Sequence, residues 1–221
     1  MQLRSDMLRK SLLVCGALAS MLYVGTDVLA AIFYPEYHSF TARVISELMA
    51  NGAPTERLVD PLFLLYGGLM MAFAVGVWLS SPRRRVRVTA CLLFAIGAIG
   101  LTGPTLFEME VRGSPPSTAD VLHIAVTAAL VLCILAAVTV GAKLRGPWFR
   151  RYSFATLLVM VVFGVLTSFA SRGLATGEPT PWFGLLERVN IGAFLLWVAV
   201  LSVGESPAYI GSPLRRAPVG R

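Results

Sequence analysis

The chain has 221 residues, of which 56% are hydrophobic and 14% are charged, and its formal net charge at pH 7 is +7. About a quarter of the residues in an ordinary soluble domain are charged. A composition this apolar therefore excludes such a domain and indicates an integral membrane protein. The three cysteines, Cys15, Cys91 and Cys133, lie in apolar stretches without paired spacing, which argues against a disulfide framework or a zinc cluster.

The sequence predicts an all-α membrane protein with six transmembrane helices in an up-and-down bundle. Crossing about 30 Å of hydrocarbon takes roughly 20 helical residues at ~1.5 Å each. Six segments are long and apolar enough, at about 11–34, 58–80, 88–106, 121–142, 153–171 and 186–204. We therefore divide the chain into a basic N-terminus (1–10), a six-span domain (11–204) and a tail (205–221) that we expect to be flexible. Gly67-Gly68 and the stretch "FAIGAIGLTG" predict close helix packing in spans two and three.

Positive charge is concentrated in four segments, which are the N-terminus, residues 83–87, residues 143–151 and the tail. The three loops between them carry more acidic than basic residues. This alternation is the positive-inside pattern, and it places both termini and the two basic loops in the cytoplasm. The basic segments contain no recognisable docking motif for nucleic acid, so we expect no nucleic-acid partner.

The loop after the first span, "HSFTARVISELMANGAP" at residues 38–54, is expected to form a short amphipathic interfacial helix. Its apolar residues follow the 3.6-residue period of a helix of about three turns, and Ser39 or Thr41 can cap its start. Arg43 and Glu47 have the i, i+4 spacing of an ion pair. Such a helix is either an interfacial connector or the cover of a polar site on the outer face.

Several polar residues lie at membrane depth or at the outer ends of the spans, where an unpaired charge is costly. Asp27 lies about 10 Å below the outer end of the first span. Asp60, directly before Pro61, either caps the second span or contributes to a site. Asp120 and His123 lie one turn apart, so the carboxylate either orients the imidazole or caps the fourth span.

Glu187 and Arg188 lie at the start of the sixth span, and Arg172 lies at the end of the fifth. These residues either form an ion pair between spans or belong to a ligand site. Together, the candidate ligand-binding residues are Asp27, His38, Ser46, Glu47, Asp60, His123, Arg172, Glu187 and Arg188. We expect no metal site among them.

Three motifs, "RVISELMANGAP", "FEMEVRGSPPSTADVLH" and "LLERVNIGAFLLW", resemble those of the bacterial membrane proteins catalogued as domain of unknown function 998. The resemblance covers nearly all of residues 11–204 and implies a six-span protein. The chain departs from the family pattern at Met49, where Gly often follows "ISEL", and at Glu108 and Glu110, where Pro and Asp are usual. The first loop is also similar to that of the Frag1/DRAM/Sfk1 group, which is linked to lipid and membrane regulation rather than to an established reaction.

The resemblance and the outer polar residues favour a non-catalytic lipid-handling or regulatory protein, multi-pass in the bacterial cytoplasmic (inner) membrane. Its expected partner is a membrane lipid or another apolar small molecule, without a cofactor, and the sequence leaves the oligomeric state open. The alternative is an intramembrane enzyme acting on a lipid or isoprenoid at the outer leaflet, with Ser46 as nucleophile or Glu47 as acid and His123 as a base oriented by Asp120. Further alternatives are a haem-binding redox protein that uses His38 and His123, and a small transporter with Asp27 as its proton or cation site.

Overall fold

The computed structural model describes residues 2–106, 108–115, 117–171 and 179–203, so Arg172 and the tail 205–221 lie outside the described residues. The described chain forms six long helices, α1 (Gln2–Phe33), α2 (Glu56–Ser80), α3 (Arg84–Leu106), α4 (Thr118–Gly141), α5 (Pro147–Ala170) and α7 (Phe183–Val203). Each contains a stretch long and apolar enough to cross a membrane, which confirms the six predicted spans. A short 3-10 helix, η1 (Ile45–Met49), follows the first of them.

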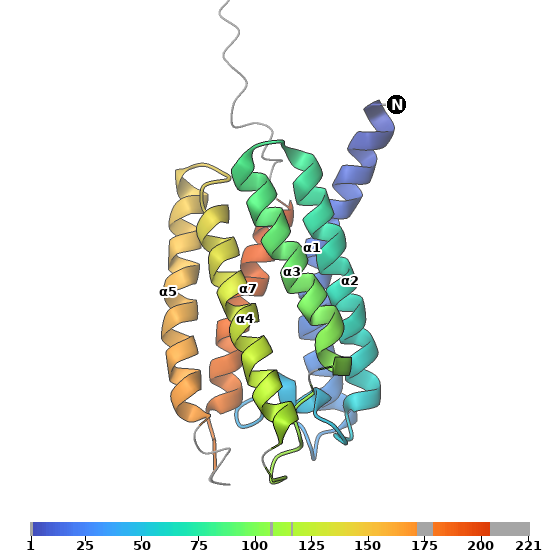
Figure 1. The fold of residues 1–221 in the computed structure, drawn as a ribbon, viewed down its shortest axis with the longest axis vertical. Helices are drawn as coiled ribbons and strands as arrows, with labels where there is room; N and C mark the ends of the chain where they lie inside the picture. Colours follow the sequence, from blue (N-terminus) through green and yellow to red (C-terminus); the bar gives the residue numbers. More distant parts are fainter. Residues whose placement is uncertain (1, 107, 116, 172–178, 204–221) are drawn as a thin grey trace, which may run out of the picture.

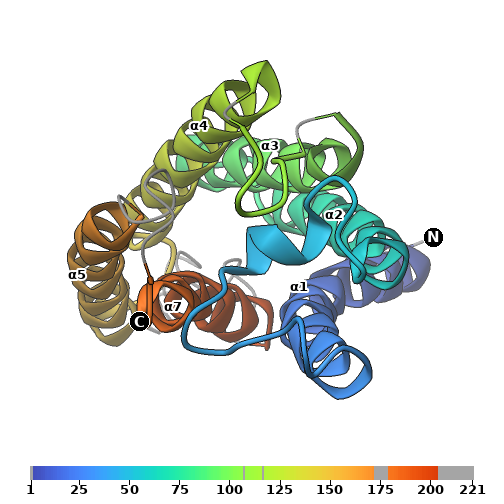
Figure 2. The same cartoon turned by 90° about the horizontal axis from the view of Figure 1, so that it is seen from below.

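The six helices stand side by side in chain order around a ring, and α7 closes the ring by packing between α5 and α1 (Figure 1, Figure 2). Short turns at 81–83 and 142–146 make neighbouring helices antiparallel. We call the end with these two turns the basic end, because it carries the arginines of 83–87 and 143–151. The opposite end, where residues 34–55 cross the mouth of the ring, is the cover end, and residues 34–55 are the cover segment (Figure 2).

Helices α2 and α3 pack closely because two glycines let their backbones touch. A Cβ on Gly67 would lie 2.8 Å from the carbonyl oxygen of Gly97, and a Cβ on Gly97 would lie 2.9 Å from the backbone nitrogen of Met71. Neither backbone can yield cheaply, so both positions need glycine. The predicted packing role is thus confirmed for Gly67 and Gly97, whereas Gly68 has nothing within 4 Å of its Cβ position.

The basic half of the bundle is closed around Trp197, whose side chain is fully buried. Its indole N–H donates to the hydroxyl of Ser153 on α5 at 2.9 Å, and its ring lies 5.9 Å from that of Phe149. A Cβ on Gly141 of α4 would meet the indole at 2.6 Å. Three helices therefore converge on one aromatic side chain, and little space remains between them here.

The cover half of the bundle is packed less completely on the side of α4, α5 and α7. The buried residues of α4 are Ile134, Ala137, Val138 and Gly141, all in its last two turns. No residue in 118–133 of α4, 161–170 of α5 or 185–193 of α7 is buried. The inner faces of these three helices are therefore accessible in the half that lies under the cover segment.

The cover segment is folded differently from the three-turn helix predicted for it. Only Ile45–Met49 is helical, as a single 3-10 element, and Ile45, Glu47 and Leu48 in it are buried. The Ser39 hydroxyl accepts the N–H of Ala42 in the preceding turn instead of starting a long helix. The predicted Arg43–Glu47 pair does form, at 3.3 Å. The position of this element relative to a membrane interface stays a prediction.

Candidate functional site

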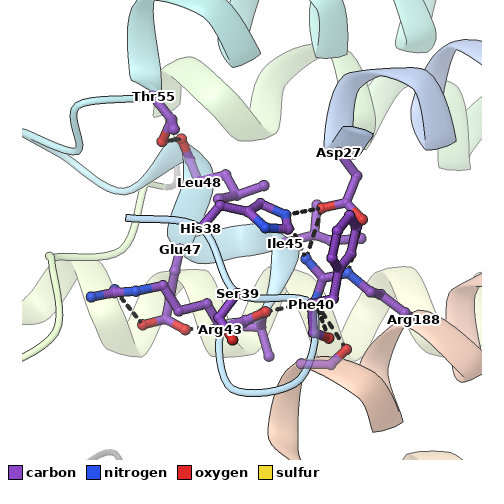
Figure 3. Close-up of polar contacts among 12 residues, drawn as sticks. Asp27, His38, Ser39, Phe40, Arg43, Ile45, Glu47, Leu48, Thr55 and Arg188 are labelled. Atoms are coloured by element: carbon purple, nitrogen blue, oxygen red, sulfur yellow. Dashed lines mark hydrogen bonds and ion pairs between the residues drawn. The ribbon is translucent and has the colours of Figure 1, made fainter. Parts of the chain in front are cut away.

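Charged side chains from four parts of the chain meet at the cover end, and we call them the polar cluster. Figure 3 shows most of them, with α1 and α7 on one side of the cover segment and the loop before α4 on the other. The cluster consists of Asp27, His38, Arg43, Glu47, Arg112, Glu187 and Arg188. It is organised as two ion-paired groups joined by the cover segment.

The first group joins α1 to α7 through Asp27 and Arg188. The guanidinium donates from Nε to Oδ2 at 2.8 Å and from Nη2 to Oδ1 at 2.7 Å, a bidentate pair between largely buried side chains. Nε2 of His38 lies 2.9 Å from Oδ1 of Asp27 and 3.3 Å from Nη2 of Arg188. Because arginine only donates and the carboxylate only accepts, Nε2 of His38 can donate to Asp27 in one tautomer or accept from Arg188 in the other.

Arg188 also fixes the path of the cover segment. Its Nη1 donates to the carbonyl oxygens of Phe40 at 3.1 Å, Arg43 at 2.6 Å and Gly184 at 3.1 Å. One arginine therefore satisfies a carboxylate of the first span and two carbonyls of an irregular segment. Irregular backbone that is shielded from water needs such partners, because an unpaired polar group there is costly.

The second group is centred on Glu47, whose side chain is fully buried. Arg112 donates to both of its oxygens, from Nε at 2.8 Å and from Nη2 at 2.9 Å, and the N–H of Val44 donates to Oε2 at 3.0 Å. The hydrogen bonds to Glu47 raise the pKa of the Arg112 guanidinium above its ordinary value. Arg112 reaches further, to the Thr180 hydroxyl at 2.8 Å and the Ala42 carbonyl at 3.1 Å. It thereby ties the loop before α4 to the cover segment and to the loop before α7.

Glu187 links the cover segment to α7 through the backbone. Its Oε2 accepts the N–H of Ile45 at 2.5 Å, and the N–H of Leu185 donates to the carbonyl of Thr41 at 3.1 Å. Gly184 permits this contact, because a Cβ there would overlap the carbonyl of Arg43. The cover segment is thus held against α7 by side chains, by backbone and by close approach.

The remaining predicted residues are placed elsewhere. Asp120 accepts the N–H of Glu110 at 3.0 Å and the N–H and hydroxyl of Ser117 at 2.9 and 3.1 Å, so it completes the capping box of α4, whose N-cap is Ser117, and anchors the preceding loop. Asp60 does not cap α2, because this helix begins at Glu56, a full turn before Asp60. Oδ1 of Asp60 is buried and has no hydrogen-bond partner within the described chain.

The predicted catalytic residues are not brought into one hydrogen-bonded unit. Among the described residues, Ser46 makes no hydrogen bond through its side chain, so it is not paired with His123. Glu47 is held by two arginines and a backbone N–H, and His38 uses Nε2 for Asp27. These groups connect parts of the protein to one another. Their catalytic assignment stays a prediction.

Sequence reasoning missed Arg112, which makes four hydrogen bonds across the cluster. A signal for it was present, because Arg112 is the one basic residue among residues 107–120, which also contain Glu108, Glu110 and Asp120. A lone arginine among carboxylates beside a membrane is a candidate for a buried pair. Its partner was not evident, because Glu47 lies 65 residues away in sequence.

These features define a multi-pass membrane protein, a six-helix bundle whose cover end is closed by a segment held in an ion-paired network. Residues 17–204 match the family described as "Protein of unknown function (DUF998)", and the chain belongs to this family. Neither the search of curated proteins nor the search of solved structures returned a match.

Proposed function

We propose that this protein is a non-catalytic lipid-handling or regulatory membrane protein, with its cover end at the outer leaflet of a bacterial inner membrane. In this proposal an amphipathic lipid occupies the incompletely packed interior of the cover half. The cover segment and the polar cluster keep that end of the bundle in shape. The basic segments at the other end support a cytoplasmic location for both termini.

The inner face of α4 carries the proposal. His123, Thr127 and Leu130 continue, at helical spacing, the face that is buried further along as Ile134, Val138 and Gly141. Thr127 is exposed, and His123 and Leu130 are only half-buried. A face that is buried at one end and accessible at the other is packed less completely by the described side chains at its accessible end.

Helices α5 and α7 also change from buried to accessible inward positions towards the cover end. On α5 the inward positions Thr156 and Met160 are buried, whereas Gly164 and Thr167, which continue that face, are half-buried. On α7 the half-buried Asn190 continues the face of the buried Trp197 and donates to the Met160 carbonyl of α5 at 3.0 Å, so the space lies beside this contact, towards α4. The accessible faces of α4, α5 and α7 together are mostly apolar with a few polar groups, as sites for amphipathic small molecules are.

A polar corner lies beside this space, where α1 and α7 approach the cover segment. Glu187 accepts one hydrogen bond, from the N–H of Ile45 to Oε2, and its Oε1 accepts none from a described residue. The Tyr23 hydroxyl, which lies within electrostatic range of Glu187, also makes no hydrogen bond to a described residue. A carboxylate disfavours a phosphate beside it. The corner therefore suits a neutral headgroup that donates hydrogen bonds, such as a hydroxyl.

A non-catalytic role is supported by how the charges are used. Asp27, Glu47 and Asp120 each accept hydrogen bonds from at least two groups of the protein itself. General acid or base catalysis requires a group that can reach a substrate proton. Carboxylates engaged in this way are better suited to holding the cover segment than to proton transfer.

The test fills the proposed lipid space with a side chain. Thr127→Trp places an indole on the inner face of α4, and Ala125→Trp places the same group two residues away on the opposite, exposed face. Each protein is purified in mild detergent, and co-purifying lipid is extracted and quantified by mass spectrometry. We expect the wild type and Ala125→Trp to retain an equimolar lipid, and Thr127→Trp to retain at least about fivefold less at an unchanged Tm, a loss equivalent to about 1 kcal/mol.

Two results would overturn the proposal. One is a wild-type protein whose lipid content does not exceed that of an unrelated membrane protein of similar size in the same detergent. The other is a folded Thr127→Trp variant that retains as much lipid as Ala125→Trp. Turnover of a lipid or isoprenoid by the wild type would instead favour the enzyme alternative.

A further inference from the structure

An apolar groove runs between α2 and α3 near the basic end, away from the cover end and its polar cluster. It encloses about 210 Å³ and is lined by Ala74, Val75, Trp78, Ala90, Cys91 and Phe94. Trp78 and Phe94 are about two-fifths exposed, so the groove opens to the outside of the bundle. In a membrane its surroundings are lipid chains.

A row of arginines continues this groove towards the end of the helices. Arg83, Arg87, Cys91 and Phe94 follow one another at helical spacing and so share one face of α3. The helical geometry includes Arg83, because its carbonyl accepts the N–H of Arg87 at 3.2 Å. The guanidinium of Arg87 lies over the ring of Trp78, 5.0 Å from its centroid. The two positive charges of Arg83 and Arg87 thus lie at one end of the apolar groove, beside Trp78.

These arginines have no acidic residue on their own helices to balance them. The sequence contains no Asp or Glu between residues 61 and 107, and the acids nearest in sequence, Asp60 and Glu108, lie at the cover end. Asp6, on α1 towards the basic end, is already paired with Arg9 at 3.4 Å. Arg83 and Arg87 are both exposed. An anionic group from outside the protein is the complementary partner for such a pair at a membrane surface.

We propose that the groove is a binding site for one anionic phospholipid of the leaflet at the basic end. The phosphate lies between Arg83 and Arg87, and the upper part of one acyl chain lies along Cys91 and Phe94. Phe94 follows Arg87 by seven residues, which places it about 10 Å deeper along the helix axis. A zwitterionic headgroup fits less well, because its ammonium group brings a further positive charge to the arginines.

This site is independent of the lipid proposed for the cover half, because it lies on the outside of other helices and at the other end of the bundle. The two ligands also differ in chemistry, since one has a neutral donor headgroup and the other a phosphate. Variants at the groove leave α4, α5 and α7 unchanged.

The first experiment measures headgroup selectivity. The full-length protein is equilibrated in detergent with equal amounts of phosphatidylglycerol and phosphatidylcholine, and bound lipid is read by native mass spectrometry. Arg87→Gln removes a charge from the groove face, and Arg85→Gln removes the same charge two residues away on another face of α3. We expect selective retention of phosphatidylglycerol in the wild type and in Arg85→Gln, and about fivefold less selectivity in Arg87→Gln.

The second experiment blocks the chain-binding part of the groove. Cys91→Trp fills it, and Val88→Trp places the same side chain at another exposed position that does not line it. We expect only Cys91→Trp to lose bound phosphatidylglycerol. Equal retention of both lipids by the wild type would show ordinary annular lipid, and equal effects of Arg85→Gln and Arg87→Gln would show diffuse charge attraction. Either result overturns the proposal.

Discussion

Arg188 and Asp27 bind each other through two parallel hydrogen bonds, 161 residues apart in sequence and between the first and last helices of the ring. This pair closes the ring at the cover end, where α1 and α7 are neighbours. Arg188 holds two carbonyls of the cover segment as well. The same side chain therefore joins the helices to each other and to the segment that crosses them.

We predict that Arg188→Met lowers the free energy of unfolding by about 3–5 kcal/mol, because it removes the charged partner of the buried Asp27 carboxylate and the donor to carbonyls of the cover segment. Asp27→Asn should cost less, since the amide oxygen still accepts from Arg188. Unfolding in detergent, followed by circular dichroism, measures both. Arg57→Met, an exposed arginine on α2, is the control and should change stability by no more than about 0.5 kcal/mol. Equal stability of Arg188→Met and Arg57→Met would contradict a structural role for the pair.

Gly184 and Gly192 on α7 should respond in opposite directions to alanine. A Cβ on Gly184 overlaps the carbonyl of Arg43, so Gly184→Ala must push the cover segment away and should cost about 2 kcal/mol or more. The Cβ of Gly192→Ala meets nothing within 4 Å, so this variant gains the higher helix propensity of alanine, about 0.5–1 kcal/mol. Limited proteolysis of the cover segment in both variants distinguishes loosening of the segment from a general loss of stability. A cover segment as resistant in Gly184→Ala as in Gly192→Ala would disprove the close contact.

The six spans could be predicted because length and hydropathy alone decide whether a helix crosses a membrane. Asp27 and Arg188 were also singled out as costly charges at depth, but their pairing could not be derived, because it depends on α7 returning to α1. The cover segment was misjudged for a related reason. Its apolar positions fit a helix. However, the N–H of Val44 donates to the Glu47 carboxylate, and the carbonyl of Arg43 accepts from Arg188, instead of forming helical hydrogen bonds. Tertiary partners therefore outweighed the local pattern.

The loop before α4 should respond to pH through Glu108. Burial, together with the charges of Glu56 and Glu110, raises the pKa of Glu108 above its ordinary value. A carboxyl with a raised folded-state pKa contributes stability that is fully present below the unfolded-state pKa and is lost as the pH rises through the folded-state pKa. At neutral pH that contribution is absent. Glu108→Gln should therefore raise the free energy of unfolding at pH 7 by no more than about 0.5 kcal/mol, seen as a slightly higher Tm, and should have no effect at pH 4. An unchanged difference between pH 4 and pH 7 would rule out this titration.

Removing the Ser153 hydroxyl tests the closed, basic half of the bundle. Ser153→Ala leaves the buried indole N–H of Trp197 without an acceptor and should cost about 1–2 kcal/mol, near the upper end for hydrogen bonds between membrane helices. Ser168→Ala is the matched control on α5, because its exposed hydroxyl donates only to its own helix, to Gly164 at 3.0 Å. A double-mutant cycle with Trp197→Phe isolates the pair from the loss of ring packing. A coupling energy near zero would mean that shape alone holds Trp197, and that α5 and α7 are joined without this hydrogen bond.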